Sequence, residues 1–199
     1  MQKFEEKKFN LPKLKGISEK TIEEHLKLYA GYVKNTNLIL SMIEMYAKVD
    51  DEGGKYSVME ISRRFGFEFN GMRNHEYYFA SLEGGPKNLE DSSELKKLIG
   101  KDFGGFEEWL TRFKTIAAIR GVGWAFLYYD PITKQLLNAW VDEHHLGQLN
   151  GCQTVLALDM WEHAFVSDYL PSGKKQYVED FFENLNLSKI EENFAGVAK

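Results

Sequence analysis

The chain has 199 residues, of which 43% are hydrophobic and 28% are charged, and its formal net charge at pH 7 is −5. A chain of this length can bury a sizeable core, either as one domain or as two small domains that share a site. The acidic balance argues against a general nucleic-acid-binding protein, and the sequence has no apolar run long enough to span a bilayer. The single cysteine, Cys152, excludes an internal disulfide, and the first eight residues lack the apolar core of a signal peptide. We therefore expect a cytoplasmic protein with no membrane or nucleic-acid partner.

The N-terminal part of the sequence predicts two long antiparallel helices. Ser18 is expected to cap the first helix, because early negative charge and a helical spacing of apolar residues follow it. The charged, glycine-containing segment 50–55 is expected to be a loop. Ser57 would then open the second helix, which we expect to run to about Leu82.

The chain pattern changes at Gly84-Gly85-Pro86, where we place a domain boundary. Residues 1–85 would form a helical hairpin domain, and residues 86–199 a C-terminal domain. The C-terminal elements expected in chain order are helices at 92–99 and 106–118, strands at 123–129, 136–141 and 153–158, and two short amphipathic helices in the tail. The expected fold class is therefore α+β, with an N-terminal antiparallel helical hairpin followed by helices packed on a small three-stranded antiparallel sheet.

The third strand leads into a short segment that is rich in chemistry, Asp159-Met160-Trp161-Glu162-His163. If a helix begins at Asp159, then Asp159 and His163 lie four residues apart and can share one cation. The alternative needs no metal. Asp159 is also a good helix N-cap, and Glu162 three residues later would complete a capping box.

Four other histidines belong to less specific patterns. His25 lies on the first helix, seven residues before Tyr32, and His75 lies near the end of the second helix. Taken alone, each is more often a core or surface group than a ligand. His144 and His145 are adjacent and follow the second strand; if they remain in strand conformation, they point to opposite faces and one of them looks into the site.

Several of these motifs together resemble the iron/manganese superoxide dismutases. The string Asp-Met-Trp-Glu-His-Ala-Phe at 159–165 resembles the C-terminal signature of that family, and Asn-His-Glu-Tyr-Tyr-Phe at 74–79 resembles its motif on the second helix. The string Gly-Val-Gly-Trp at 121–124 resembles a family motif that places the tryptophan against a metal pocket. The resemblance implies one iron or manganese ion per chain, with iron slightly favoured, and the ligands His25, His75, Asp159 and His163.

The first helix departs from the family pattern. This chain has one residue fewer than the family between His25 and Tyr32, so both side chains can face the site only if the helix lacks the family's bulge. A glutamine that many iron enzymes carry on the second helix aligns here with Met72 or Gly71, which cannot supply its hydrogen bond. His144 is therefore the expected outer-sphere donor, with Gln148 in reserve.

The function implied by the resemblance is superoxide dismutation. One-electron cycling of the metal would convert superoxide to dioxygen and hydrogen peroxide, with Tyr32 and His144 relaying protons. The family also implies a homodimer or higher homo-oligomer, with Glu162 and His163 at the interface. Two other functions remain open: a zinc-dependent hydrolase with the same ligands, and a non-catalytic relative that serves as an interaction module.

Overall fold

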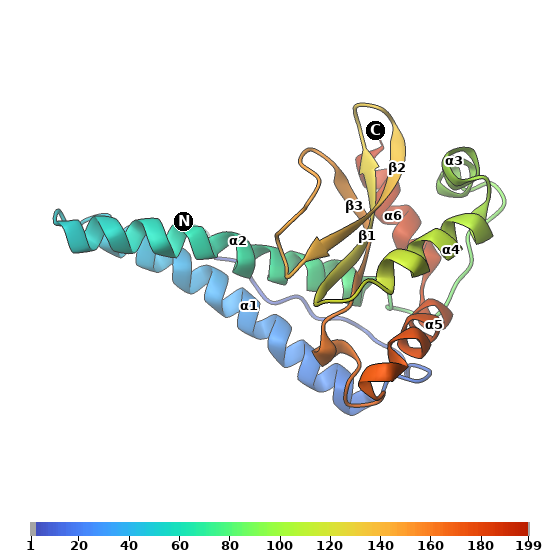
Figure 1. Cartoon of the computed structure of the whole chain (residues 1–199), viewed down its shortest axis with the longest axis horizontal. Coiled ribbons are helices and arrows are strands. Elements are labelled where there is room, and N and C mark those ends of the chain that lie inside the picture. The colour runs from blue at the N-terminus through green and yellow to red at the C-terminus, as the bar shows by residue number, and fades with distance from the viewer. Residues whose placement is uncertain (1–2, 199) are drawn as a thin grey trace.

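The computed structural model describes residues 3–198 and has a long helical hairpin followed by helices that pack around a small sheet (Figure 1). The helices are α1 (Glu19–Tyr46), α2 (Glu52–Ala80), α3 (Glu94–Phe103), α4 (Phe106–Ala117), α5 (Lys174–Asn184) and α6 (Leu187–Val197). The strands are β1 (Gly123–Asp130), β2 (Gln135–Asp142) and β3 (Gln153–Asp159). This arrangement confirms the predicted α+β fold. No helix within the described chain is both long and apolar enough to cross a membrane.

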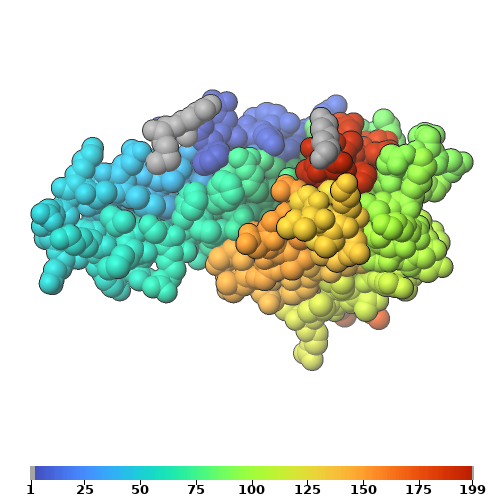
Figure 2. Space-filling view, turned by 90° about the horizontal axis from the view of Figure 1, so that it is seen from above, coloured from blue at the N-terminus to red at the C-terminus, as the bar shows by residue number. Residues whose placement is uncertain are grey.

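The hairpin begins where the sequence predicts and turns earlier than predicted. Ser18 caps α1, with its hydroxyl accepting the Thr21 backbone N–H at 3.2 Å. The expected start of the second helix at Ser57 was wrong, because Asp51 caps α2 and accepts the Gly54 N–H at 2.7 Å. The two glycines of this segment therefore lie in the first turn of the helix. The far ends of α1 and α2 project beyond the rest of the chain (Figures 1 and 2).

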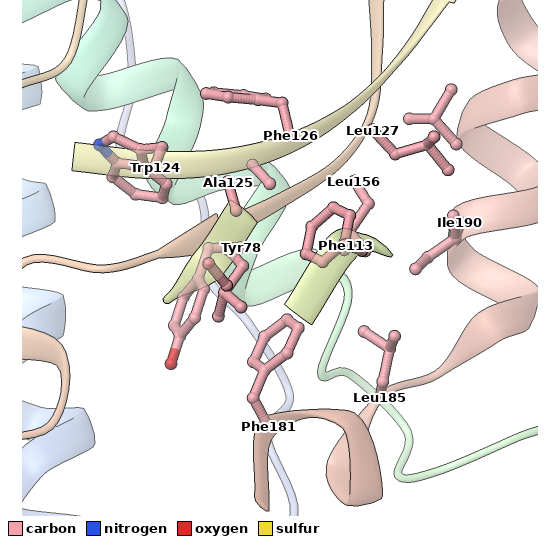
Figure 3. Packing of buried hydrophobic residues seen from close by; sticks show 14 of the residues in the cluster. Tyr78, Phe113, Trp124, Ala125, Phe126, Leu127, Leu156, Phe181, Leu185 and Ile190 are labelled. Carbon is pink, nitrogen blue, oxygen red and sulfur yellow. The ribbon is translucent and has the colours of Figure 1, made fainter. Parts of the chain in front are cut away.

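The three strands form an antiparallel sheet in the order β2-β1-β3. The central strand β1 is buried along nearly its whole length, because it has a neighbouring strand on each side and helices over the sheet. Its side chains join those of α4, α5 and α6 in the main core, where Phe113, Phe126 and Phe181 are fully buried (Figure 3). The register of this sheet brings Trp124 opposite Asp159. One end of the sheet is thereby fixed against the helical hairpin.

One prediction required an α-helix to begin at Asp159. The structure has no helix there. Asp159 remains paired in the sheet, the Met160 N–H donates to the Gly123 carbonyl at 2.9 Å, and a short 3-10 helix, η1 (Glu162–Ala164), follows. A second 3-10 turn, η2 (Pro171–Gly173), precedes α5. Asp159 Oδ1 accepts the Trp161 N–H at 2.8 Å. The carboxylate thus closes a local turn and does not cap an α-helix, which removes the capping-box alternative.

Candidate metal centre

Four side chains from four different elements meet at the end of the sheet that faces the hairpin. They are His25 on α1, His75 on α2, Asp159 at the end of β3 and His163 on η1, and their candidate ligand atoms all lie within 4.8 Å of one another. The first three are fully buried, and the His163 side chain is 21% exposed. The structure therefore brings together all four residues that the sequence predicts as ligands.

The geometry of the cluster centres on one carboxylate oxygen. Asp159 Oδ2 lies 3.1 Å from Nε2 of His25, 3.1 Å from Nε2 of His163 and 3.5 Å from Nε2 of His75. Three imidazoles and one carboxylate are a ligand set that suits a first-row transition metal. The three Nε2 atoms converge from different directions, because α1, α2 and η1 each approach the end of β3 separately.

His75 supplies the sharpest test of whether this cluster fits a metal. Its Nδ1 lies 2.6 Å from the Gly71 carbonyl, which can only accept, so Nδ1 carries the proton and Nε2 carries a lone pair. Nε2 is buried and has no hydrogen-bond partner within the described residues. A buried lone pair without a donor is costly. A cation bound between His75 and Asp159 would satisfy it, so the residues present fit a metal ion.

The electrostatics of the cluster favour neutral imidazoles at His25 and His75 beside an ionised carboxylate at Asp159. Burial lowers the pKa of His25 below its ordinary value and lowers the pKa of His75 further. Burial alone would raise the pKa of Asp159, but the neighbouring imidazoles of His163 and His25 outweigh it and hold that pKa well below its usual range. Metals bind neutral imidazole and ionised carboxylate, so His25, His75 and Asp159 are in the protonation states that binding requires.

The shortened first helix turns out to suit the site. α1 is an uninterrupted α-helix from Glu19 to Tyr46, so it lacks the bulge that would have rotated one of the two residues away. Two residues seven apart in a regular α-helix lie on nearly the same face. His25 accordingly reaches Asp159, and Tyr32 packs beside His75 with ring centroids 5.1 Å apart.

Beyond the four residues, a hydrogen-bonded chain connects Trp124, His144 and Tyr32. The Trp124 indole N–H donates to His144 Nδ1 at 3.0 Å, and His144 Nε2 lies 2.7 Å from the Tyr32 hydroxyl. Because an indole N–H can only donate, Nδ1 is the acceptor and the His144 proton resides on Nε2. Nε2–H then donates to Tyr32, which leaves the hydroxyl proton of Tyr32 available to a further acceptor.

His144 faces the site for a different reason from the one predicted. Residues 143–145 form a turn and not a strand, and Glu143 has a left-handed φ of 51°. The premise of alternating strand faces was therefore wrong. The turn still separates the two imidazoles, since His144 is fully buried while His145 is half-buried against Phe67 with ring centroids 5.7 Å apart. Burial lowers the pKa of His144 to about 4, so its ring is neutral near pH 7.

Two amides hold this turn from outside the ligand cluster. The Gln148 and Asn74 side chains each donate to the His144 carbonyl at 3.1 Å. Gln148 thus supports the backbone of the turn, and its reserve role as an outer-sphere donor stays a prediction. Asn74 was not predicted to have a role, although it precedes His75 in the motif. The signal that could have found it is an amide side chain directly before a predicted ligand, because such an amide needs a hydrogen-bond partner when it is buried.

Gly71 permits the close approach of Tyr32 to α2. A Cβ built on Gly71 would lie 2.6 Å from Cδ1 of Tyr32, whereas a Cβ on Gly31 would meet nothing within 4 Å. We expect Gly71→Ala to lower the free energy of unfolding by about 1–3 kcal/mol through overpacking. Gly31→Ala should raise the free energy of unfolding by about 0.4–1 kcal/mol, because alanine reduces the conformational entropy of the unfolded chain. Urea unfolding of both variants measures these changes, and equal effects would contradict the contact between Gly71 and Tyr32.

Comparison with known proteins identifies relatives along most of the chain. The sequence profile described as "Iron/manganese superoxide dismutases, C-terminal domain" matches residues 91–193. The "Superoxide dismutase [Fe]" of Aquifex aeolicus is 33% identical, over 94% of this chain and 88% of the relative. The "Superoxide dismutase [Mn/Fe]" of Aeropyrum pernix is 30% identical, over 93% of this chain and 90% of the relative.

A third relative is named for manganese alone. The "Superoxide dismutase [Mn]" of Haloarcula marismortui is 42% identical, over 53% of this chain and 51% of the relative. The relatives therefore carry iron, manganese or both in their names. The matches that span most of the chain include the segments that hold all four clustered residues.

Proposed function

The chain belongs to the iron/manganese superoxide dismutase family, and we propose that it dismutates superoxide with one iron or manganese ion held by His25, His75, Asp159 and His163. The observation that carries this proposal is the Nε2 of His75, which lies beside the Asp159 carboxylate and has no hydrogen-bond partner among residues 3–198. When bound, the ion supplies one-electron redox chemistry. A zinc hydrolase and a non-catalytic module are not favoured, because the relatives are named as dismutases of iron or manganese.

The ligand charges account for the choice of an anionic substrate. An imidazole that binds a metal is neutral and Asp159 contributes one negative charge, so a divalent or trivalent ion bound there retains net positive charge. Positive charge in a buried site attracts superoxide even though the chain as a whole carries a net charge of −5. Trp124 is fully buried beside His75, with ring centroids 5.1 Å apart, and excludes water from that side.

Tyr32 and His144 are the groups that we propose to hold protons for the reaction. Conversion of superoxide to hydrogen peroxide consumes two protons, so a donor must lie near the substrate. The Tyr32 hydroxyl accepts from His144 Nε2–H and keeps its own proton free to donate. Burial raises the pKa of Tyr32 above its ordinary value, which keeps the hydroxyl protonated at neutral pH.

The direct test is elemental analysis of native protein together with a superoxide dismutase assay. We expect about one iron or manganese per chain and activity that disappears on removal of the metal and returns when the same metal is restored. Parallel reconstitution with iron and with manganese shows which ion supports activity. Protein that holds only zinc would contradict the proposed function. Protein that is inactive with iron and also inactive with manganese would contradict it too.

We further propose that the chain works as a homodimer in which Glu162 reaches His163 of a second copy. Glu162 is exposed and His163 is the most exposed of the four candidate ligands. Glu162→Ala should shift sedimentation from dimer towards monomer, because the hydrogen bond that His163 donates across the two-fold axis is lost. Glu107→Ala, which removes an exposed acid on α4, is the matched control. A stable, fully metallated and active monomer of the natural chain would contradict this assembly.

The predicted division into residues 1–85 and 86–199 remains a proposal. It is supported by left-handed φ angles of 74° at Gly84 and 79° at Gly85, where the chain leaves α2. The family match to a C-terminal domain over residues 91–193 is consistent with that boundary. A cytoplasmic location likewise remains a proposal.

A further inference from the structure

Two buried tyrosines outside the ligand cluster are joined to Asp159 by hydrogen bonds. Tyr177 on α5 places its hydroxyl oxygen 2.9 Å from the Asp159 carbonyl oxygen and 3.2 Å from the hydroxyl oxygen of Tyr78 on α2. Both tyrosines are fully buried. Tyr78 lies at the edge of the apolar cluster, and its hydroxyl points away from the hydrophobic side chains labelled in Figure 3. The family resemblance assigned these two hydroxyl groups no role.

The Asp159 carbonyl decides the direction of the two hydrogen bonds that Tyr177 makes. A carbonyl can only accept, so the single hydroxyl proton of Tyr177 points to Asp159. When Tyr177 donates there, its oxygen is free to accept the proton of Tyr78. Consecutive hydrogen bonds of one direction polarise each other and strengthen the last bond, which is the one to Asp159.

The anchored carbonyl belongs to the residue on which the ligand cluster converges. Asp159 Oδ2 faces all three imidazoles, and Oδ1 is held by the Trp161 N–H at 2.8 Å. The backbone carbonyl fixes the peptide plane from which the side chain extends. Its partner Tyr177 also stacks on Phe165, two residues after His163, with ring centroids 5.2 Å apart. Tyr177 therefore contacts both ends of the segment that carries Asp159 and His163.

We propose that Tyr177 is a positioning residue for the metal, which orients the Asp159 carboxylate through its backbone carbonyl, and that Tyr78 supports Tyr177. This inference rests on the proposed function, because it takes Asp159 as a metal ligand. Tyr78 also reaches the cluster directly, since its ring lies 5.0 Å from that of His25. The two hydroxyl groups connect α2, the helix that carries His75, with α5.

The test compares iron-loaded Tyr177→Phe, Tyr78→Phe and the double variant with the natural chain. Each substitution removes one hydroxyl and keeps the ring. We expect Tyr177→Phe to lose iron to a chelator about tenfold faster, the lower end of the usual effect of losing an outer-shell partner. It should also change the electron paramagnetic resonance spectrum of the ferric protein, because the carboxylate is reoriented. Tyr78→Phe should show a smaller change, and the double variant should match Tyr177→Phe.

The control is Tyr169→Phe. Tyr169 donates to Asp180 at 2.6 Å, so this variant also removes a tyrosine hydrogen bond near α5 without touching the Asp159 carbonyl. We expect it to lower the melting temperature while the ferric spectrum and the rate of iron loss stay unchanged. An unaltered spectrum and rate in Tyr177→Phe, or equal changes in Tyr169→Phe, would overturn the inference. If Tyr177→Phe does not fold, an unaltered spectrum and rate in Tyr78→Phe would overturn it. A natural chain that binds neither iron nor manganese would refute the proposed function itself.

Discussion

Asp159→Ala should empty the metal centre and reduce dismutase activity to background. The substitution removes the one charged group of the candidate ligand set and leaves three imidazoles without the oxygen on which they converge. Lost charge and an open coordination position both weaken binding of a first-row metal. His75→Ala should have the same result, because it removes the nitrogen whose lone pair has no other partner within residues 3–198.

Elemental analysis and thermal unfolding together check this expectation. The natural chain should unfold at a higher temperature with metal than without it, because an ion that binds only the folded state stabilises that state. Asp159→Ala should lose this difference entirely. Asp91→Ala, which removes a fully exposed carboxylate paired with Lys96, is the matched control and should retain both metal and the difference. Full metal occupancy in Asp159→Ala or His75→Ala would show that the ligands are assigned wrongly.

The fold was predictable from the sequence where local signals decide it. The serine cap at Ser18 and the apolar spacing after it locate α1, and the run of aromatic residues after Gly123 locates β1. The start of α2 was missed because two adjacent glycines indicated a loop. Asp51 overrides that signal by capping the helix with its side chain, so the backbone cost of the glycines is offset.

The candidate ligands were identified by motif, but their surroundings depend on tertiary geometry that no motif contains. The spacing of Asp159 and His163 predicted that an α-helix would bring the two side chains together. In the structure a 3-10 turn brings them together. The left-handed conformation at Glu143 that aims His144 inward has no clear local signal, since glutamate rarely adopts it. Tyr177 lies 99 residues after Tyr78, in the other domain of the proposed division, so no local sequence signal shows that the two side chains touch.

His144→Ala should retain metal but lower turnover by roughly ten- to a hundredfold, the usual scale for the loss of an outer-shell partner. The substitution removes the group that lies between the Trp124 indole and the Tyr32 hydroxyl. Tyr32 would then lose the donor that directs its proton, and the reduction potential of the metal should shift. His144→Gln is the informative companion, because an amide can accept from Trp124 and donate to Tyr32, and should recover much of the activity.

His145→Ala is the matched control, because it removes the adjacent imidazole from the same turn. Its Nδ1 has no partner in the part of the chain that the structure covers, and its ring rests against Phe67 outside the hydrogen-bonded chain. Turnover and potential should therefore remain near those of the natural protein. Stopped-flow decay of superoxide gives turnover, and redox titration of the metal gives the potential. Equal losses in the two alanine variants, or natural activity in His144→Ala, would show that the path from Trp124 to Tyr32 does not control the chemistry.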